Sequence, residues 1–119
     1  MKLNTILLTI VLALSATPAL ADGQLEIVTG KNWMGSSLEE KRAYLFGIGN
    51  LLQLERAMAG DDYQSMRGSS IVPVLLDGLS EVPLDDIVMQ LDEFYTVNAD
   101  QNDRAVIEVL YLEMALPNL

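Results

Sequence analysis

Carboxylates are the side chains of this sequence best able to do chemistry, because it contains neither histidine nor cysteine. Histidine is the commonest general base, and histidine and cysteine are the usual zinc ligands. Catalysis would therefore need paired carboxylates, a serine–lysine pair or a metal ion held by oxygen atoms. Adjacent acidic pairs are present at Asp61-Asp62, Asp85-Asp86 and Asp92-Glu93.

These pairs are poorly arranged for acid–base catalysis. Neighbouring residues of a helix point about 100° apart, so the two carboxylates of a pair do not face each other. The segment Asp100-Gln101-Asn102-Asp103 begins like a calcium loop, but it lacks the glycine at position 6 and has Tyr111 where a bidentate glutamate is needed at position 12. We therefore expect a protein that is not an enzyme, with no catalytic residue, no metal ion and no cofactor.

Residues 1–21 have the pattern of a cleaved secretory signal peptide. Lys2 supplies the positive start, residues 6–14 form an apolar run, and Ala19-Leu20-Ala21 supplies the small residues of a cleavage site. The apolar run is shorter than the ~20 residues that span a membrane, although a retained anchor is the competing interpretation. We expect cleavage after Ala21 and one soluble domain over residues 22–119 in a bacterial periplasm.

Residues 22–119 carry six cationic and 17 acidic side chains, a net charge of −11. This charge repels phosphate backbones and anionic membranes, so we expect neither a nucleic-acid partner nor a membrane partner. It favours a basic protein partner, although acidity that merely keeps an exported protein soluble is the simpler interpretation. Without cysteine there is no disulfide, and the fold must be held by its core.

Capping signals predict an all-α domain of four helices around a central one that contains glycine. Ser37 and Glu40 form a capping box at the start of this central helix, which should end at Gly60, a residue able to take a positive φ. Glycine, proline and serine signals predict three further helices. Their expected ranges are 71–79 after Ser70, 83–98, and from 100–103 to Pro117, with 25–29 as an extended arm.

Gly47 and Gly49 lie in the middle of the central helix, where each costs about 1 kcal/mol relative to alanine. Apolar residues occupy two nearly opposite sides of this helix, and the two glycines, about 200° apart, fall on different sides. We therefore expect a helix that is packed on both sides, with each glycine allowing a different neighbour to approach closely.

Four residues are candidates for contact with a partner: Trp33, Arg42, Phe46 and Tyr63. Trp33 precedes the central helix, where it either packs onto the first turn and core or forms an exposed hot spot. Phe46 lies beside a narrow polar strip that includes Arg42, and it either edges the core or is an exposed anchor. Tyr63, in a polar loop, is a similar candidate.

The segments "EEKRAYLFGIGNLL" (39–52) and "DDIVMQLDEFYTVNADQNDRAVIEVLYLEMALP" (85–117), after a tryptophan and a signal peptide, resemble small periplasmic helical proteins of the Rap/Tai type. Those immunity proteins neutralise amidase toxins delivered by type VI secretion. The resemblance covers most of residues 22–119 and implies a helical protein that occludes a toxin or another partner. Members of that family, and the acid chaperone HdeA with a related architecture, typically carry a disulfide that this chain lacks, and no binding residue is carried over by position.

Three functional interpretations follow. The first is an exported protein that binds another protein, with an immunity-type toxin inhibitor as one form. The alternative is an acid or stress chaperone, because protonation of the carboxylates would reverse the net charge and open the domain. The third, an uncharacterised enzyme, requires a pocket lined by converging carboxylates.

Overall fold

The computed structural model describes residues 25–119, so the predicted signal peptide, residues 1–21, lies outside the described residues. The described chain is helical and has no strand. Its α-helices are α1 (Gly30–Met34), α2 (Leu38–Ala59), α3 (Val72–Leu79), α4 (Leu84–Val97) and α5 (Val106–Val109). The predicted all-α class is confirmed, with one α-helix more than the four expected. No helix among residues 25–119 has the length and apolar character needed to cross a membrane.

The helix that the sequence did not reveal is α1, which lies directly after the expected extended arm. Its first two backbone N–H groups donate to a distant segment: Gly30 to the carbonyl of Arg104 at 3.1 Å and Lys31 to that of Asn102 at 3.1 Å. A β-bridge between Thr29 and Ala105 continues this contact. A five-residue helix has little stability of its own, so these tertiary bonds hold it.

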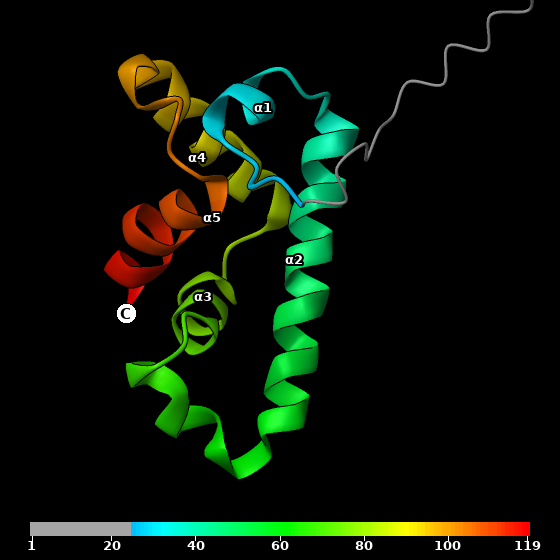
Figure 1. Ribbon diagram of the computed structural model, residues 1–119, viewed down its shortest axis with the longest axis vertical. Coiled ribbons are helices and arrows are strands. Elements are labelled where there is room, and N and C mark those ends of the chain that lie inside the picture. The colour runs from blue at the N-terminus through cyan, green and yellow to red at the C-terminus, as the bar shows by residue number, and fades with distance from the viewer. Residues whose placement is uncertain (1–24) are drawn as a thin grey trace, which may run out of the picture.

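Helix α2 begins and ends where the capping signals predict. The Glu40 N–H donates to Ser37 Oγ at 3.2 Å, and the Ser37 N–H donates to Glu40 Oε2 at 2.7 Å. Gly60 ends the helix with a φ of +52°, a conformation that L side chains rarely adopt. The other helices lie on one side of α2 in Figure 1, and only Leu45 and Leu52 of its 22 residues are buried. The prediction of a central helix packed on two sides is therefore wrong.

The prediction that Gly47 and Gly49 allow close approach is also wrong. A Cβ added at either position would meet no atom within 4 Å. The close approaches occur at two other glycines. A Cβ at Gly78 of α3 would come within 2.7 Å of the carbonyl carbon of Ala115, and one at Gly30 would overlap the ring of Tyr95.

The core lies between α3, α4 and the C-terminal helix. That helix starts as α5, continues as a π-helical segment, Leu110–Ala115, and ends in a 3₁₀ turn, Leu116–Asn118. The expected start at residues 100–103 was too early, because Ala105 is extended and precedes α5. The least exposed core residues, at 0–1%, are Trp33, Leu75, Leu91, Val106, Val109, Leu110 and Ala115.

The remaining boundaries agree with local signals. Pro83 is the N-cap of α4 and Asn98 is its C-cap. Ser70 accepts a hydrogen bond from the N–H of Val72 at the start of α3, at 3.2 Å. Between α2 and α3 the polar segment forms a 3₁₀ helix, Gly60–Gly68, at the end of the molecule where the chain reverses (Figure 1).

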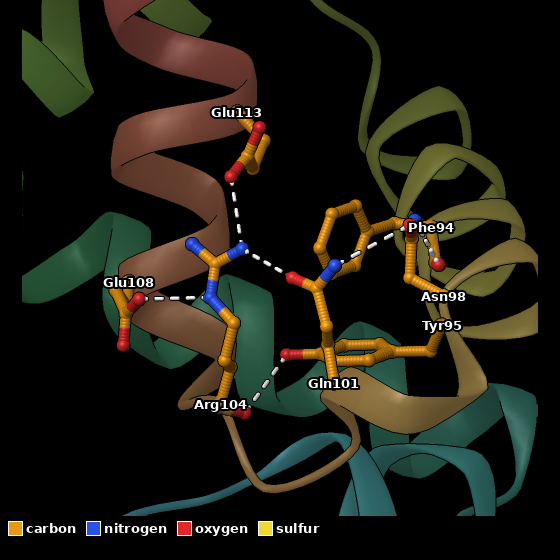
Figure 2. A network of polar contacts seen from close by, with 7 residues as sticks. All are labelled: Phe94, Tyr95, Asn98, Gln101, Arg104, Glu108 and Glu113. Carbon is orange, nitrogen blue, oxygen red and sulfur yellow. Dashed lines mark hydrogen bonds and ion pairs between the residues drawn. The ribbon is translucent and has the colours of Figure 1, made fainter.

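A polar network around Arg104 joins the C-terminal helix to the turn after α4 (Figure 2). The Arg104 guanidinium donates to Glu108 at 2.8 Å, and to Gln101 and Glu113 at 2.9 Å each. The same guanidinium lies 5.4 Å from the ring centroid of Phe94. Since only 23% of the Arg104 side chain is exposed, these contacts compensate for the water that it has lost.

Tyr95 lies beside this network (Figure 2). Its hydroxyl donates to the backbone carbonyl of Arg104 at 3.1 Å, and its ring packs edge-on against Phe94. Burial raises the pKa of Tyr95 to about 12. The neutral phenol is therefore the form that the folded protein favours.

Candidate binding surfaces on helix α2

Trp33 is a core residue and not a surface for a partner. It is 1% exposed, its indole N–H donates to Asp92 Oδ1 at 2.7 Å, and its ring packs edge-on against Tyr44. Lys41 Nζ donates to the same Asp92 oxygen at 2.9 Å. Asp92 thus joins α1, α2 and α4, and the core interpretation of Trp33 is confirmed. The other interpretation, in which Trp33 is an exposed hot spot for a partner, is wrong.

The prediction that Tyr63 is an exposed residue able to contact a partner is also wrong. It is 5% exposed, and its hydroxyl donates to Asp77 Oδ1 of α3 at 3.1 Å. Arg67 pairs with the other oxygen of Asp77. The 3₁₀ fold of the polar segment turns the ring inward, where it ties this segment to α3.

Arg42 joins α2 to the start of α4. Its Nε and Nη2 donate to the two carboxylate oxygens of Asp85 at 2.8 and 2.9 Å. The hydrogen bonds from Arg42 lower the pKa of Asp85. Because the guanidinium is used inside the domain, Arg42 is a structural residue in this state.

Phe46 is the sequence candidate that the structure leaves exposed. It is 66% exposed, which favours the interpretation as an anchor over the interpretation as a core edge. Phe46 is also one of the residues that line an open cavity beside α2.

The side of α2 that faces away from the other helices carries a continuous apolar row. We call this row the outer stripe; it consists of Ala43, Gly47, Leu51, Leu54 and Met58. Spacings of three and four residues place these positions on one face of a helix. Leu51, Leu54 and Met58 are 65%, 58% and 77% exposed.

The charged residues of α2 are distributed unequally around this stripe. The acids Glu39, Glu40 and Glu55 are exposed. The cations Lys41 and Arg42 instead pair with acids of α4, and the third cation, Arg56, stacks on the ring of Tyr63. Solvent next to the outer stripe therefore meets negative charge.

The second surface is an open cavity of about 400 Å³, which we call the inner cavity. It lies between α2, α3 and the segment that leads into α4. Most of its lining is apolar and includes Leu45, Leu52, Leu75, Leu76, Leu79 and Ile87. Polar lining comes from Asn50, Gln53 and Ser80, and the one charged lining residue is Arg56.

Sequence patterns did not identify either region as an exposed surface. The outer-stripe residues have the periodicity of a packed face, and periodicity does not reveal whether a neighbour is present. The inner cavity depends on where α3 lies against α2, which no local signal contains.

No cluster of possible metal ligands is found in the part of the chain that the structure describes. Within residues 25–119, no group of three or more histidine, cysteine or acidic residues could hold a metal ion, and the inner cavity is lined by no acid. Comparison of the chain with protein-family models, curated proteins and solved structures finds no match. A functional assignment therefore depends on the two surfaces of α2.

Proposed function

We propose that this protein binds another protein through the outer stripe of α2, and that it does so after export to the periplasm. The supporting observation is the exposure of Leu51, Leu54 and Met58, each more than half accessible to solvent on one helix face. Burying such side chains is the main source of affinity when a partner helix packs against an exposed face. Ala43 and Gly47 extend the row with small residues that let a partner backbone come close.

Charge selects the kind of partner. The exposed acids Glu39, Glu40 and Glu55 and the net charge of −11 on residues 22–119 favour a helix whose apolar face is flanked by lysine or arginine. A second copy of this chain would present the same acids and would be repelled. An immunity-type inhibitor is the form of this function that the resemblance to the Rap/Tai type implies, with a basic toxin as the partner.

Site-specific photo-crosslinking tests the proposal. A photoreactive side chain at position 54 should capture one basic partner in the periplasm, while the same group at Val97 of α4, which is 74% exposed, should not. The captured partner is then purified for calorimetry. Leu54→Glu should weaken its binding at least tenfold, because the change removes apolar contact and adds an acid. Val97→Glu, the matched control, should bind like the parent.

Capture of the same partner from both positions, or equal affinity of Leu54→Glu and the parent, would exclude the outer stripe as the interface. Capture of many unrelated proteins would point instead to a chaperone.

The acid-chaperone alternative is favoured by the way the elements are joined. Ion pairs with carboxylates connect α2 to α4 through Asp85 and Asp92, and the 3₁₀ helix to α3 through Asp77. Since Arg42 lowers the pKa of Asp85, the stabilisation by this pair is present above the ordinary pKa of 3.8 and is lost as the pH falls through the lowered value. Acid should therefore weaken the contact between α2 and the start of α4.

Near-ultraviolet circular dichroism, dye binding and suppression of client aggregation at pH 2–3 test this alternative. A chaperone should lose fixed packing, expose apolar surface and keep clients soluble. A protein that stays folded and inert under these conditions is not an acid chaperone.

A further inference from the structure

We infer that the inner cavity binds an amphiphile with a single alkyl chain and one carboxylate, such as a medium-chain fatty acid, and that Arg56 anchors the carboxylate. This inference goes beyond protein binding, because it uses the side of α2 that faces α3 and not the outer stripe.

The size and lining of the inner cavity suit an alkyl chain. At about 400 Å³ it lies in the lower part of the usual range for ligand pockets, roughly 300–1,000 Å³. Leucine side chains of α2 and α3 line it, and Phe46 lines it while remaining 66% exposed. A bound chain would cover part of this exposed apolar surface, which is the source of affinity for alkyl groups.

The charge of the lining selects the headgroup. Residues 25–119 contain 16 acids, yet none of them lines the inner cavity, and Arg56 is the one charged residue that they contribute to its lining. The headgroup of a cationic amphiphile would therefore be repelled by Arg56 and would find no acid in the lining, whereas a carboxylate could pair with the Arg56 guanidinium. Repulsion from more distant acids is screened over about 8 Å at physiological ionic strength.

Arg56 is also available for a ligand. Of the six cations within residues 25–119, five form ion pairs, and Arg56 is the one that pairs with no carboxylate of this range. Its guanidinium lies 5.1 Å from the ring centroid of Tyr63. This cation–π contact occupies the face of the guanidinium and not its N–H donors, which form no ion pair with an acid of residues 25–119. A planar guanidinium with free donors matches a carboxylate in a two-bond arrangement.

Gly49 has a role in this site that helix packing does not explain. It lines the inner cavity, and a Cβ placed there would touch nothing within 4 Å. Any side chain at this position would project into space that an alkyl chain needs. Glycine keeps that wall open, although it is a poor helix former.

Calorimetry with dodecanoate, dodecanol and dodecyltrimethylammonium, each below its micelle-forming concentration, tests the headgroup. Dodecanoate should bind at least tenfold more tightly than dodecanol, and the trimethylammonium compound should bind most weakly. Shortening the chain to decanoate should weaken binding about fourfold for each methylene removed. No binding of dodecanoate, or equal binding of the cationic compound, would overturn the inference.

Three variants locate the site. Arg56→Gln should lose at least tenfold affinity for dodecanoate and keep its affinity for dodecanol. Gly49→Leu should lose both ligands, while Gly47→Leu, two residues away on the outer stripe, should bind like the parent. Binding by Gly49→Leu at the parent's affinity would overturn the inference.

Methyl NMR of the parent protein supplies a test that needs no variant. Dodecanoate should shift the methyl signals of Leu79 and Ile87, which line the cavity. Shifts confined to Leu51 and Leu54 would place the ligand on the outer stripe and overturn the inference.

Discussion

Replacing Gly78 by alanine would insert a methyl group into the backbone of the C-terminal helix. The added Cβ would lie 2.6 Å from Cα of Ala115 and 2.7 Å from its carbonyl carbon. Carbon atoms pack at about 3.5–4.0 Å, so α3 and the π-helical segment would have to move apart by about 1 Å. The obstacle is buried backbone, which cannot rotate aside as a side chain can.

The size of the effect follows from two opposing contributions. Overpacking a core by one methyl group costs about 1–3 kcal/mol, and contact with backbone places Gly78→Ala towards the upper end. Alanine recovers at most about 1 kcal/mol of helix propensity. We therefore expect Gly78→Ala to lower the free energy of unfolding by about 1–2 kcal/mol. Gly47→Ala, which meets no atom within 4 Å, should raise it by about 0.5–1 kcal/mol.

Thermal and urea unfolding, followed by circular dichroism, separate the two variants. In a domain of this size 1 kcal/mol corresponds to a shift in Tm of about 4–8 °C, so Gly78→Ala should melt below the parent and Gly47→Ala above it. A Gly78→Ala protein that is as stable as the parent would refute the close contact of α3 with Ala115. A destabilised Gly47→Ala protein would show that the outer stripe is packed inside the domain.

Three further predictions concern the polar contacts. Arg104→Ala should destabilise the protein by about 1–2 kcal/mol in urea unfolding, because the partly buried hydrogen-bond network of Arg104 is lost. Arg42→Ala breaks one exposed ion pair and should destabilise the protein less. Equal effects of the two variants would argue against the network. Since the folded-state pKa of Tyr95 is raised to about 12, stability should fall as the pH rises from about 10 to 12. Tyr95→Phe should show a shallower fall across that window, and an unchanged slope would contradict this. Asp85→Asn should lower the urea midpoint at neutral pH and flatten the decline of that midpoint below about pH 4. The reason is that Arg42 stabilises only the ionised carboxylate of Asp85, which lowers its pKa. A decline as steep as the parent's would show that this pair does not contribute.

Helix ends were predictable because their signals are local. The Ser37–Glu40 capping box, Gly60 and Pro83 all lie where the sequence places them. The hydrogen bonds that decide these positions join residues three or four apart, so a short window contains the whole interaction. The short helix α1 also has a local cap, in which the Thr29 N–H donates to Asn32 Oδ1 at 2.9 Å. Its first N–H groups, however, bond to a segment more than 70 residues away, which no local pattern contains.

The location of the binding surfaces was not predictable for the opposite reason. The helical wheel of α2 identifies its apolar sides correctly, but Leu51 and Leu54 face solvent and only the side with Leu45 and Leu52 packs. Trp33 and Tyr63 are buried, and their polar atoms donate hydrogen bonds to Asp92 and Asp77, which come from other helices. Which aromatic residue is buried depends on these distant partners, and periodicity contains no information about them.

The contacts of α1 also constrain the order in which the molecule can fold. The N–H of Val106 donates to the carbonyl of Val28 at 2.9 Å, and the N–H of Gly30 donates to the carbonyl of Arg104. These bonds close a loop of more than 70 residues, and such long-range closure carries an entropic cost that local helices do not have. The α1 segment therefore cannot reach its final structure until almost the whole chain has been synthesised. A ribosome-bound chain that still lacks residues 102–106 would therefore leave the backbone groups of residues 28–31 without their partners.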